Sequence, residues 1–199
     1  MIEVEEKFIF DKGSEKKVIQ GANFLGEKLL IDTYYDTKDY ALTTKDTWLR
    51  NRNGNFELKV PLNEGKGIND RIVDRYDELE TAEEIRKALS IPMERTLKED
   101  LKMKGYYPFA TLVTTRRKYK KGDFNIDLDI VDFGYKIIEI ELMVKDSLEM
   151  KQAVERINFF AKEKGLISRI ERIIRGKLIE YIYRNDSKHY LALIEAGVV

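Results

Sequence analysis

The sequence contains no cysteine, which excludes disulfides, thiolate nucleophiles and cysteine-based zinc sites. It has a single histidine, His189, close to the end of the chain. A metal site built from several histidines therefore cannot form, and we do not expect a histidine-based catalytic triad. We expect His189 to lie on a helix surface without a chemical task. The lack of cysteine also fits a reducing compartment.

The chain also has no net charge, because 36 Lys and Arg residues balance 36 Asp and Glu residues. Without a net field, nothing steers the protein towards nucleic acid or an anionic membrane, so any charge-based function must be local. No apolar run approaches the length that spans a bilayer, and the charged N-terminus is not a signal peptide. We expect a soluble, cytoplasmic monomer with no nucleic-acid and no membrane partner.

What the chain does contain is enough hydrophobic sequence for one sizeable core, at 43% of 199 residues. We expect a single domain over residues 1–199. Short connections between strands favour an antiparallel sheet or barrel decorated with helices, an α+β fold. A hairpin is indicated at Asn53-Gly54-Asn55, and a capping box at Thr81-Ala82-Glu83-Glu84. The predicted strands are residues 2–10, 28–36, 48–52, 56–60, 68–79, 109–119, 124–131 and 135–144; the predicted helices begin at Ser14, Thr81, Met93, Asp146 or Ser147, Lys177 and Ser187.

Charged residues recur at a spacing of two along these strands. In the first strand, Glu3, Glu5 and Lys7 share one face. The same spacing returns at Trp48, Arg50 and Arg52, at Glu57 and Lys59, at Asp127 and Asp129, and at Glu139 and Glu141. Any one of these pairs alone would favour a solvated outer face. Because the helices need apolar strand surface to cover, the recurrence predicts that the charged faces line a lumen or cleft.

The two signs of charge make different chemical demands. Crowded carboxylates repel one another unless cations intervene, and all-oxygen ligation suits Mg²⁺ or Mn²⁺. Crowded cations require anions, and the arginine fork matches phosphate oxygens. On the sixth strand we choose Arg117 over Arg116, because only one of two neighbours can face inward. The acidic set is Glu3, Glu5, Asp127, Asp129, Glu139 and Glu141; the basic set is Lys7, Arg50, Arg52, Lys59, Arg117 and Lys177. Together they predict a site for a metal-bound polyphosphate.

At this point the sequence resembles the CYTH superfamily of triphosphate tunnel metalloenzymes. Glu3-Val4-Glu5-Glu6-Lys7 matches the Glu-x-Glu-x-Lys signature of that family. Within the family, the chain is most similar to the animal-type thiamine triphosphatases. The further matching segments, in family order, are Asp32-Thr33-Tyr34-Tyr35-Asp36-Thr37, Trp48-Leu49-Arg50, Glu57-Leu58-Lys59, Asp127-Leu128-Asp129, Asp132-Phe133-Gly134-Tyr135, Glu139-Ile140-Glu141 and Lys177-Leu178-Ile179.

The resemblance implies a closed eight-stranded antiparallel barrel, the triphosphate tunnel, with surrounding helices. It implies that the basic set binds phosphate oxygens and that the acidic set holds Mg²⁺, with Mn²⁺ as the alternative. The implied activity is hydrolysis of the terminal phosphate of thiamine triphosphate. Candidate catalytic residues are Lys7, Lys59, Glu5 and Tyr34. Trp48 would face the thiazolium ring in a cation–π contact, although a core or barrel-rim role is the common fate of a strand tryptophan.

Three functions remain open. The first is thiamine triphosphate hydrolysis. The second is an inorganic triphosphatase, or a relative acting on nucleotide or other organic triphosphates. The third is a non-catalytic polyphosphate-binding module, since the same side chains would serve binding without turnover.

Overall fold

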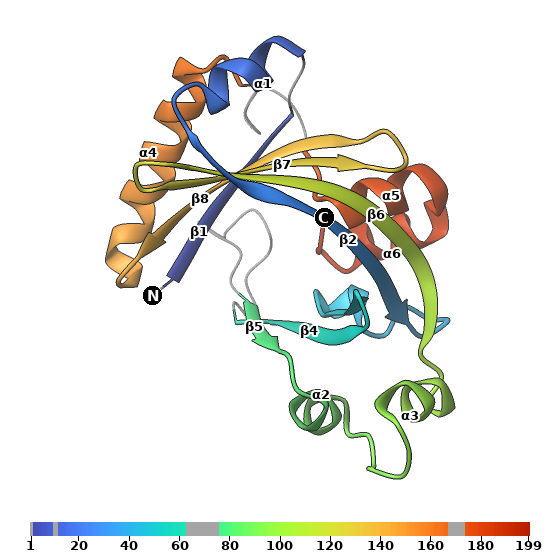
Figure 1. Cartoon of the computed structure of the whole chain (residues 1–199). Helices are drawn as coiled ribbons and strands as arrows, with labels where there is room; N and C mark the ends of the chain where they lie inside the picture. The colour runs from blue at the N-terminus through green and yellow to red at the C-terminus, as the bar shows by residue number, and fades with distance from the viewer. Residues whose placement is uncertain (1, 10–11, 63–75, 167–173) are drawn as a thin grey trace. The chain divides into compact units, whose positions relative to one another are not determined.

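The structure is a computed structural model that describes residues 2–9, 12–62, 76–166 and 174–199 (Figure 1). Its strands are β1 (Ile2–Ile9), β2 (Asn23–Asp36), β3 (Trp48–Arg52), β4 (Asn55–Pro61), β5 (Tyr76–Leu79), β6 (Tyr107–Lys121), β7 (Phe124–Val131) and β8 (Lys136–Val144). Its helices are α1 (Lys12–Ile19), α2 (Ala82–Leu89), α3 (Leu97–Met103), α4 (Met150–Glu163), α5 (Lys177–Asn185) and α6 (Ser187–Glu195), with 3-10 turns η1 (Thr43–Lys45) and η3 (Ser147–Glu149).

The eight strands follow the order β1-β8-β7-β6-β2-β3-β4-β5 in one hydrogen-bonded sheet. The register is antiparallel between β1 and β8, β7 and β8, β6 and β7, β2 and β3, β3 and β4, and β4 and β5. The predicted α+β class with an eight-stranded antiparallel sheet is therefore confirmed. The closed barrel is not confirmed, because no register among the described residues joins β1 to β5.

Several element boundaries differ from the predicted ones. Strand β2 begins at Asn23, well before the predicted residue 28, and it continues through Gly26. Helix α3 begins at Leu97 rather than Met93, because Thr96 caps it and forms a capping box with Glu99. Of the predicted strand 68–79, the described part is β5, and residues 63–75 lie outside the described residues.

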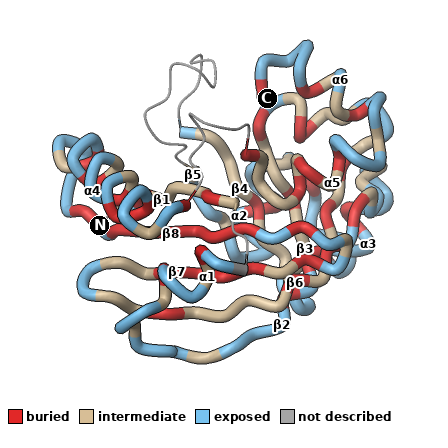
Figure 2. The backbone as a smooth tube through the Cα atoms, turned by 90° about the horizontal axis from the view of Figure 1, so that it is seen from above, coloured by how far each residue is buried: buried red, intermediate tan, exposed pale blue. Residues whose placement is uncertain are grey.

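The chain forms two compact units. The first unit comprises residues 1–30 and 113–180. In it, α4 contacts β1 and β8, and both views place this helix along these two strands (Figures 1 and 2). Val4 and Phe8 of β1, Ile138 and Ile140 of β8, and Ile157 of α4 are all at most 1% exposed. The apolar faces of the strands thus form a core beneath a helix, which leaves the charged faces on the other side.

The second unit comprises residues 31–112 and 181–199. Its core is the cluster Leu42, Leu49, Leu58, Ile85, Ile91, Leu97 and Leu101. Helix α2 has the predicted capping box, in which Glu84 N donates to Thr81 Oγ1 at 3.2 Å. The predicted β3–β4 hairpin is also confirmed: Arg52 pairs with Asn55, and the two turn residues have positive φ, 49° at Asn53 and 97° at Gly54.

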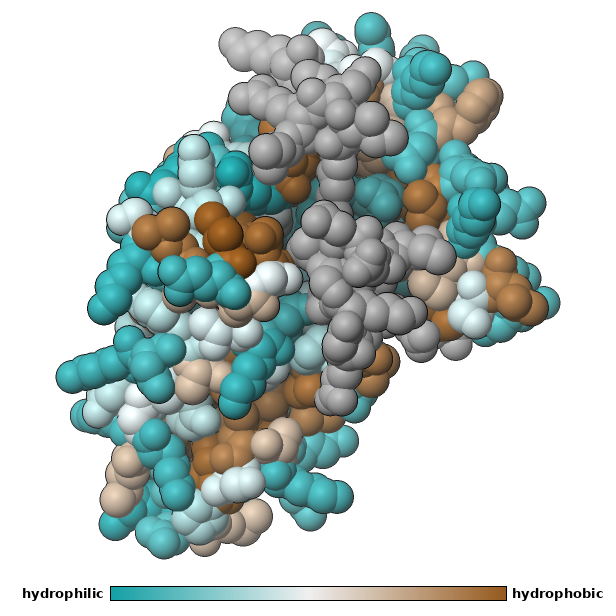
Figure 3. All heavy atoms as spheres, turned by 180° about the vertical axis from the view of Figure 1, so that it is seen from behind, coloured by the Kyte–Doolittle hydropathy of each residue, from teal (hydrophilic) through white to brown (hydrophobic). Residues whose placement is uncertain are grey.

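Hydrophilic side chains predominate on the face of the molecule seen in Figure 3, and hydrophobic side chains form smaller patches among them. Within the described part of the chain, no helix combines the length and apolar character needed to cross a membrane.

Candidate functional site

One short hairpin and one pairing of distant strands set the acidic face of the first unit. The β7–β8 turn, where Val131 N donates to Tyr135 O at 2.9 Å, places Asp127 opposite Glu139. Pairing of β1 with β8 then places Lys7 opposite Glu139 and Glu5 opposite Glu141. Since directly paired residues point to the same side of a sheet, these side chains share one face, as the spacing of two predicts.

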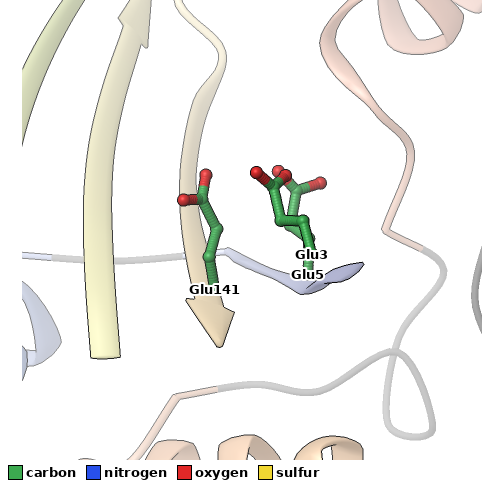
Figure 4. A group of neighbouring side chains, drawn as sticks. All are labelled: Glu3, Glu5 and Glu141. Carbon is green, nitrogen blue, oxygen red and sulfur yellow. The ribbon is translucent and has the colours of Figure 1, made fainter. Parts of the chain in front are cut away.

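Two groups of carboxylates converge on this face. Glu3, Glu5 and Glu141 form one group, and their carboxylates rise from β1 and β8 on the same side of the sheet (Figure 4). Asp127, Glu139 and Glu141 form the other. Within each group, one oxygen from every residue lies within 4.8 Å of the others, so Glu141 belongs to both groups. Five of the six predicted acidic ligands are thereby brought together.

Most of these carboxylates are buried rather than on a solvated exterior. Asp127, Glu139 and Glu141 are 0%, 5% and 8% exposed, and Asp129 is fully buried, whereas Glu3 is exposed. Burial, reinforced by the charges of Glu3, Asp127 and Glu5, raises the pKa of Glu141 to about 8. Burial likewise raises the pKa of Asp127. Several ionised carboxylates in a buried space repel one another, so the ionised state of this group requires nearby positive charge.

The donor set fits a hard divalent cation. Both carboxylate oxygens of Asp127 are buried and accept no hydrogen bond among the described residues, although Oδ2 lies 2.6 Å from Arg116 Nη1. A buried oxygen without a hydrogen bond is costly, and a metal ion would compensate it. Carboxylate oxygens alone, without histidine or cysteine, are the ligands of Mg²⁺ and Mn²⁺ rather than Zn²⁺.

The sixth predicted acidic ligand, Asp129, is bound to cations instead. Arg116 donates to it from Nε and Nη2, both at 2.7 Å, and Lys177 at the start of α5 donates to the same carboxylate. Lys177 also donates to Glu139 Oε1 at 3.0 Å, and Arg116 reaches Glu139 as well. Burial opposes ionisation of Glu139, but these two cations outweigh it and lower its pKa.

The choice of Arg117 over Arg116 by strand register is wrong. The β6–β7 register pairs Arg116 with Asp129 and Lys118 with Asp127, so Arg116 lies on the acidic face. Arg117 pairs with Leu128 and its side chain donates to Glu15 of α1. The signal that could have found this is the Lys121-Gly122-Asp123-Phe124 turn. If residue 121 pairs with 124, then counting five residues away from the turn along each strand aligns residue 116 with residue 129.

The predicted catalytic pair of the first unit is in contact. Lys7 Nζ donates to Glu5 Oε1, and the two side chains are 21% and 24% exposed. This ion pair adds a cation directly to the Glu3, Glu5 and Glu141 group. Whether either residue transfers a proton stays a prediction.

The second unit holds the other predicted basic residues, each paired with a carboxylate. Arg52 donates to both oxygens of Asp32, at 2.6 and 2.9 Å. Arg50 Nε donates to Glu57 Oε2 at 2.7 Å, and Lys59 Nζ donates to Glu78 Oε1 at 2.6 Å. Asp32, 2% exposed, and Glu78 were not singled out from the sequence. In the structure Arg52 pairs with Asp32 and Lys59 with Glu78 across the sheet. The connections between these strands are too long to be tight turns, so the sequence could not have given this register.

Two aromatic residues of the predicted site lie in the same unit. Tyr34 is 8% exposed and pairs across the sheet with Arg50. Burial opposes the charge of Arg50, but Tyr34, Asp32 and Glu57 outweigh it and raise the pKa of the guanidinium. Trp48, at the start of β3, is half-buried and pairs with Lys59. Trp48 therefore adjoins a predicted phosphate-binding lysine.

The expected surface position of His189 is wrong, because this residue is 0% exposed. Its ring stacks on Tyr40 at 4.0 Å, and its Nε2 lies 2.7 Å from Thr43 Oγ1. Nδ1 is buried without a hydrogen-bond partner in the described part of the chain. His189 joins α6 to the segment that precedes β3.

Comparisons with known proteins agree with this geometry. The chain is 29% identical to thiamine-triphosphatase of Homo sapiens, over 99% of this chain and 91% of that protein. PH1819 protein from Pyrococcus horikoshii has a similar structure, with a TM-score of 0.66 and 26% identity over 92% of this chain and 99% of that one. PH1012 protein from the same organism gives a TM-score of 0.57 and 21% identity, over 83% and 92% of the two chains. The CYTH domain model matches residues 1–173, which confirms the resemblance seen in the motifs, and this chain belongs to the CYTH domain family.

Proposed function

We propose that this protein is a metal-dependent triphosphatase that hydrolyses the terminal phosphoanhydride of thiamine triphosphate to give thiamine diphosphate and phosphate. The observation that carries the proposal is the convergence of five carboxylates in two groups that share Glu141, with Lys7, Arg116 and Lys177 among them. The similarity to a thiamine-triphosphatase over nearly the whole chain supports the choice of substrate.

Glu3, Glu5, Asp127, Glu139 and Glu141 would hold the metal, and Mg²⁺ is the ion that their hard oxygen atoms suit best. When bound, a divalent ion supplies Lewis-acid polarisation of the phosphoryl oxygens. Arg116 and Lys177 bind Asp129 and Glu139, and their charges lower the pKa of Glu139, so the charge of Glu139 is balanced rather than neutralised by protonation.

Arg50, Arg52 and Lys59 would bind the phosphate oxygens. Each of these cations is already held by a carboxylate, and for Arg52 that carboxylate is engaged at both oxygens, so its guanidinium is fixed before substrate arrives. Phosphoryl transfer needs mostly positioning and neutralisation of charge on the transferred group and the leaving diphosphate. Fixed cations serve both needs without reorganisation.

A water molecule would attack the terminal phosphorus in line with the leaving oxygen. Lys7, in contact with Glu5, is the first candidate for handling the proton of the attacking water, followed by Lys59 and Tyr34; each would accept that proton only in its deprotonated form. Trp48 would face the positively charged thiazolium ring. Replacing Trp48 by Ala should then reduce kcat/KM for thiamine triphosphate more than for tripolyphosphate, and an equal loss would contradict the contact.

A substrate panel tests the proposal. The purified protein is incubated with thiamine triphosphate, tripolyphosphate or ATP, each with Mg²⁺, Mn²⁺ or EDTA, and released phosphate and pyrophosphate are measured. We expect phosphate from thiamine triphosphate, highest with Mg²⁺ and abolished by EDTA. A higher kcat/KM for tripolyphosphate would identify an inorganic triphosphatase, pyrophosphate from ATP a nucleotide-acting enzyme, and binding without turnover a non-catalytic module.

A further inference from the structure

A buried carboxylate joins two aromatic side chains next to the predicted phosphate-binding residues of the second unit. Asp46 is 6% exposed. Its Oδ1 accepts a hydrogen bond from Trp48 Nε1 at 2.9 Å and another from the Tyr76 hydroxyl at 2.8 Å. One oxygen atom therefore fixes both the indole of β3 and the phenol of β5.

The backbone that carries Asp46 is itself held in place. Asp46 ends the turn η1 in a left-handed conformation, with φ 56° and ψ 28°, and its N–H donates to Thr43 O. The preceding residues are anchored by Asp36, whose carboxylate accepts from Leu42 N at 2.9 Å and Thr43 N at 2.8 Å. The turn thus fixes the position of the Asp46 carboxylate, and the two hydrogen bonds to this carboxylate fix the Trp48 and Tyr76 rings relative to the turn.

The two rings border a cation of the predicted phosphate site. Trp48 and Lys59 are paired across β3 and β4. Lys59 Nζ lies 5.8 Å from the centre of the Tyr76 ring. Trp48 and Tyr76 are both half-buried, so each residue keeps some accessible surface. An organic group attached to a phosphate chain at Lys59 would be within reach of these rings.

We propose that Asp46 is a positioning residue that orients Trp48 and Tyr76 to receive a cationic heteroaromatic group at the organic end of the triphosphate. This inference rests on the proposed function. A cation is attracted to the face of an aromatic ring and not to its edge, so ring orientation determines the strength of the contact. Rings fixed in advance lose less conformational freedom on binding. Inorganic tripolyphosphate has no such group and does not depend on the ring orientation.

The left-handed backbone of Asp46 allows a matched pair of variants. Asp46→Gly removes the acceptor, and glycine adopts positive φ without strain. Asp46→Asn keeps an oxygen at the Oδ1 position, and asparagine tolerates the same backbone conformation. Asp39→Gly, an exposed residue in the same connection, is the control for added flexibility. Tyr76→Phe removes one of the two donors and keeps the ring.

The first measurement is the specificity ratio, kcat/KM for thiamine triphosphate divided by kcat/KM for tripolyphosphate. We expect Asp46→Gly to lower this ratio about tenfold, the size of one lost cation–π contact, mainly through KM for thiamine triphosphate. Tyr76→Phe should lower it less, while Asp46→Asn and Asp39→Gly should keep the wild-type ratio. A merely structural role for Asp46 would lower both kcat/KM values alike and leave the ratio unchanged.

The second measurement is independent of activity. Trp48 is the only tryptophan, so fluorescence reports on this indole alone. Its steady-state anisotropy should fall in Asp46→Gly and recover in Asp46→Asn, and quenching by thiamine diphosphate should weaken in the same order. An unchanged ratio or unchanged anisotropy in a folded Asp46→Gly variant overturns the inference. If Asp46→Gly does not fold, the specificity ratio of Tyr76→Phe decides, because this variant loses one hydrogen bond to Asp46 while Trp48 keeps its own; an unchanged ratio in Tyr76→Phe then overturns the inference.

The proposed hydrolysis and the positioning role can fail separately. A wild-type protein that hydrolyses neither substrate overturns the hydrolysis, and the positioning role still stands if thiamine diphosphate quenches Trp48 in the wild type and less in Asp46→Gly. If the wild type is active and Asp46→Gly keeps the wild-type specificity ratio and anisotropy, only the positioning role is overturned. A wild type that neither hydrolyses nor binds overturns both.

Discussion

Arg116 and Asp129 face each other across the β6–β7 hairpin and share two hydrogen bonds of 2.7 Å, from Nε to Oδ1 and from Nη2 to Oδ2. The same guanidinium lies 2.6 Å from Asp127 and also contacts Glu139. One cation therefore serves three carboxylates, two of which belong to the group around Glu141. The remaining negative charge of that group is what a metal would neutralise.

Replacing Arg116 by Gln should destabilise the protein strongly. The three carboxylates are at most 5% exposed, and loss of their shared cation leaves buried charge uncompensated, which costs about 3–5 kcal/mol. Arg117→Gln is the matched control, because it removes only the half-exposed contact with Glu15 and should cost less than about 1 kcal/mol. Urea unfolding at neutral pH compares the two variants. Equal losses would mean that Arg116 does not hold the acidic face together.

Replacing Glu5 by Gln should raise the Mg²⁺ concentration needed for half-maximal activity. The substitution removes one carboxylate from the Glu3, Glu5 and Glu141 group, and we expect a shift of at least about tenfold, as for other changes close to a metal. Glu6→Gln is the matched control, since Glu6 pairs with Ile140 and lies on the opposite face of β1. The assay is phosphate release across a Mg²⁺ titration. A similar shift in Glu6→Gln would argue against a metal site on the Glu5 face.

The acidic face could be predicted because it depends on information within single strands. Alternation at Asp127 and Asp129, and at Glu139 and Glu141, places each pair on one face whatever the strand pairs with. Capping at Thr81 and the turn at Asn53-Gly54 are also local, since one residue type has a direct physical reason to occupy each position. These features were read correctly from the sequence.

What could not be predicted depends on contacts between distant segments. The sequence pattern predicts Asp129 as a metal ligand, but in the fold Lys177 of α5, 48 positions further along the chain, donates to its carboxylate. His189 reads as a surface residue until the turn around Thr43 covers it. Arg116 is a different case, because the hairpin turn fixes its register and the information was present in the sequence.

Replacing Arg52 by Ala should lower kcat/KM for triphosphate hydrolysis by about 10²–10³, the usual cost of losing one fixed donor to the transferred group. The fold should persist, since the variant leaves Asp32 facing Arg50, 4.0 Å away. Arg156→Ala on α4, which removes an exposed ion pair with Asp123, should keep wild-type activity. Steady-state kinetics with both substrates makes the comparison. A fully active Arg52→Ala variant would refute its role in phosphate binding.

Acidification should destabilise the protein through His189. Burial lowers the pKa of this imidazole, with Asp186 and Asp36 opposing the shift more weakly. A histidine with a lowered pKa in the folded state takes up its proton more readily when unfolded. Its contribution is therefore constant above the unfolded pKa of about 6.5 and is lost as pH falls below it.

The test compares wild type with His189→Gln in urea unfolding at about pH 7.5 and about pH 5.0, on either side of the unfolded pKa of histidine. The wild-type free energy of unfolding should fall more between the two conditions than that of the variant, because glutamine does not titrate. The carboxylates titrate equally in both proteins, so the difference isolates His189. Nδ1 has no hydrogen-bond partner among the described residues, so a proton placed there would be buried without compensation. Protonation of His189 is therefore costly in the folded protein but not in the unfolded chain, and acidification favours unfolding. Parallel falls in the two proteins would show that His189 accepts a proton as easily in the folded protein as in the unfolded chain.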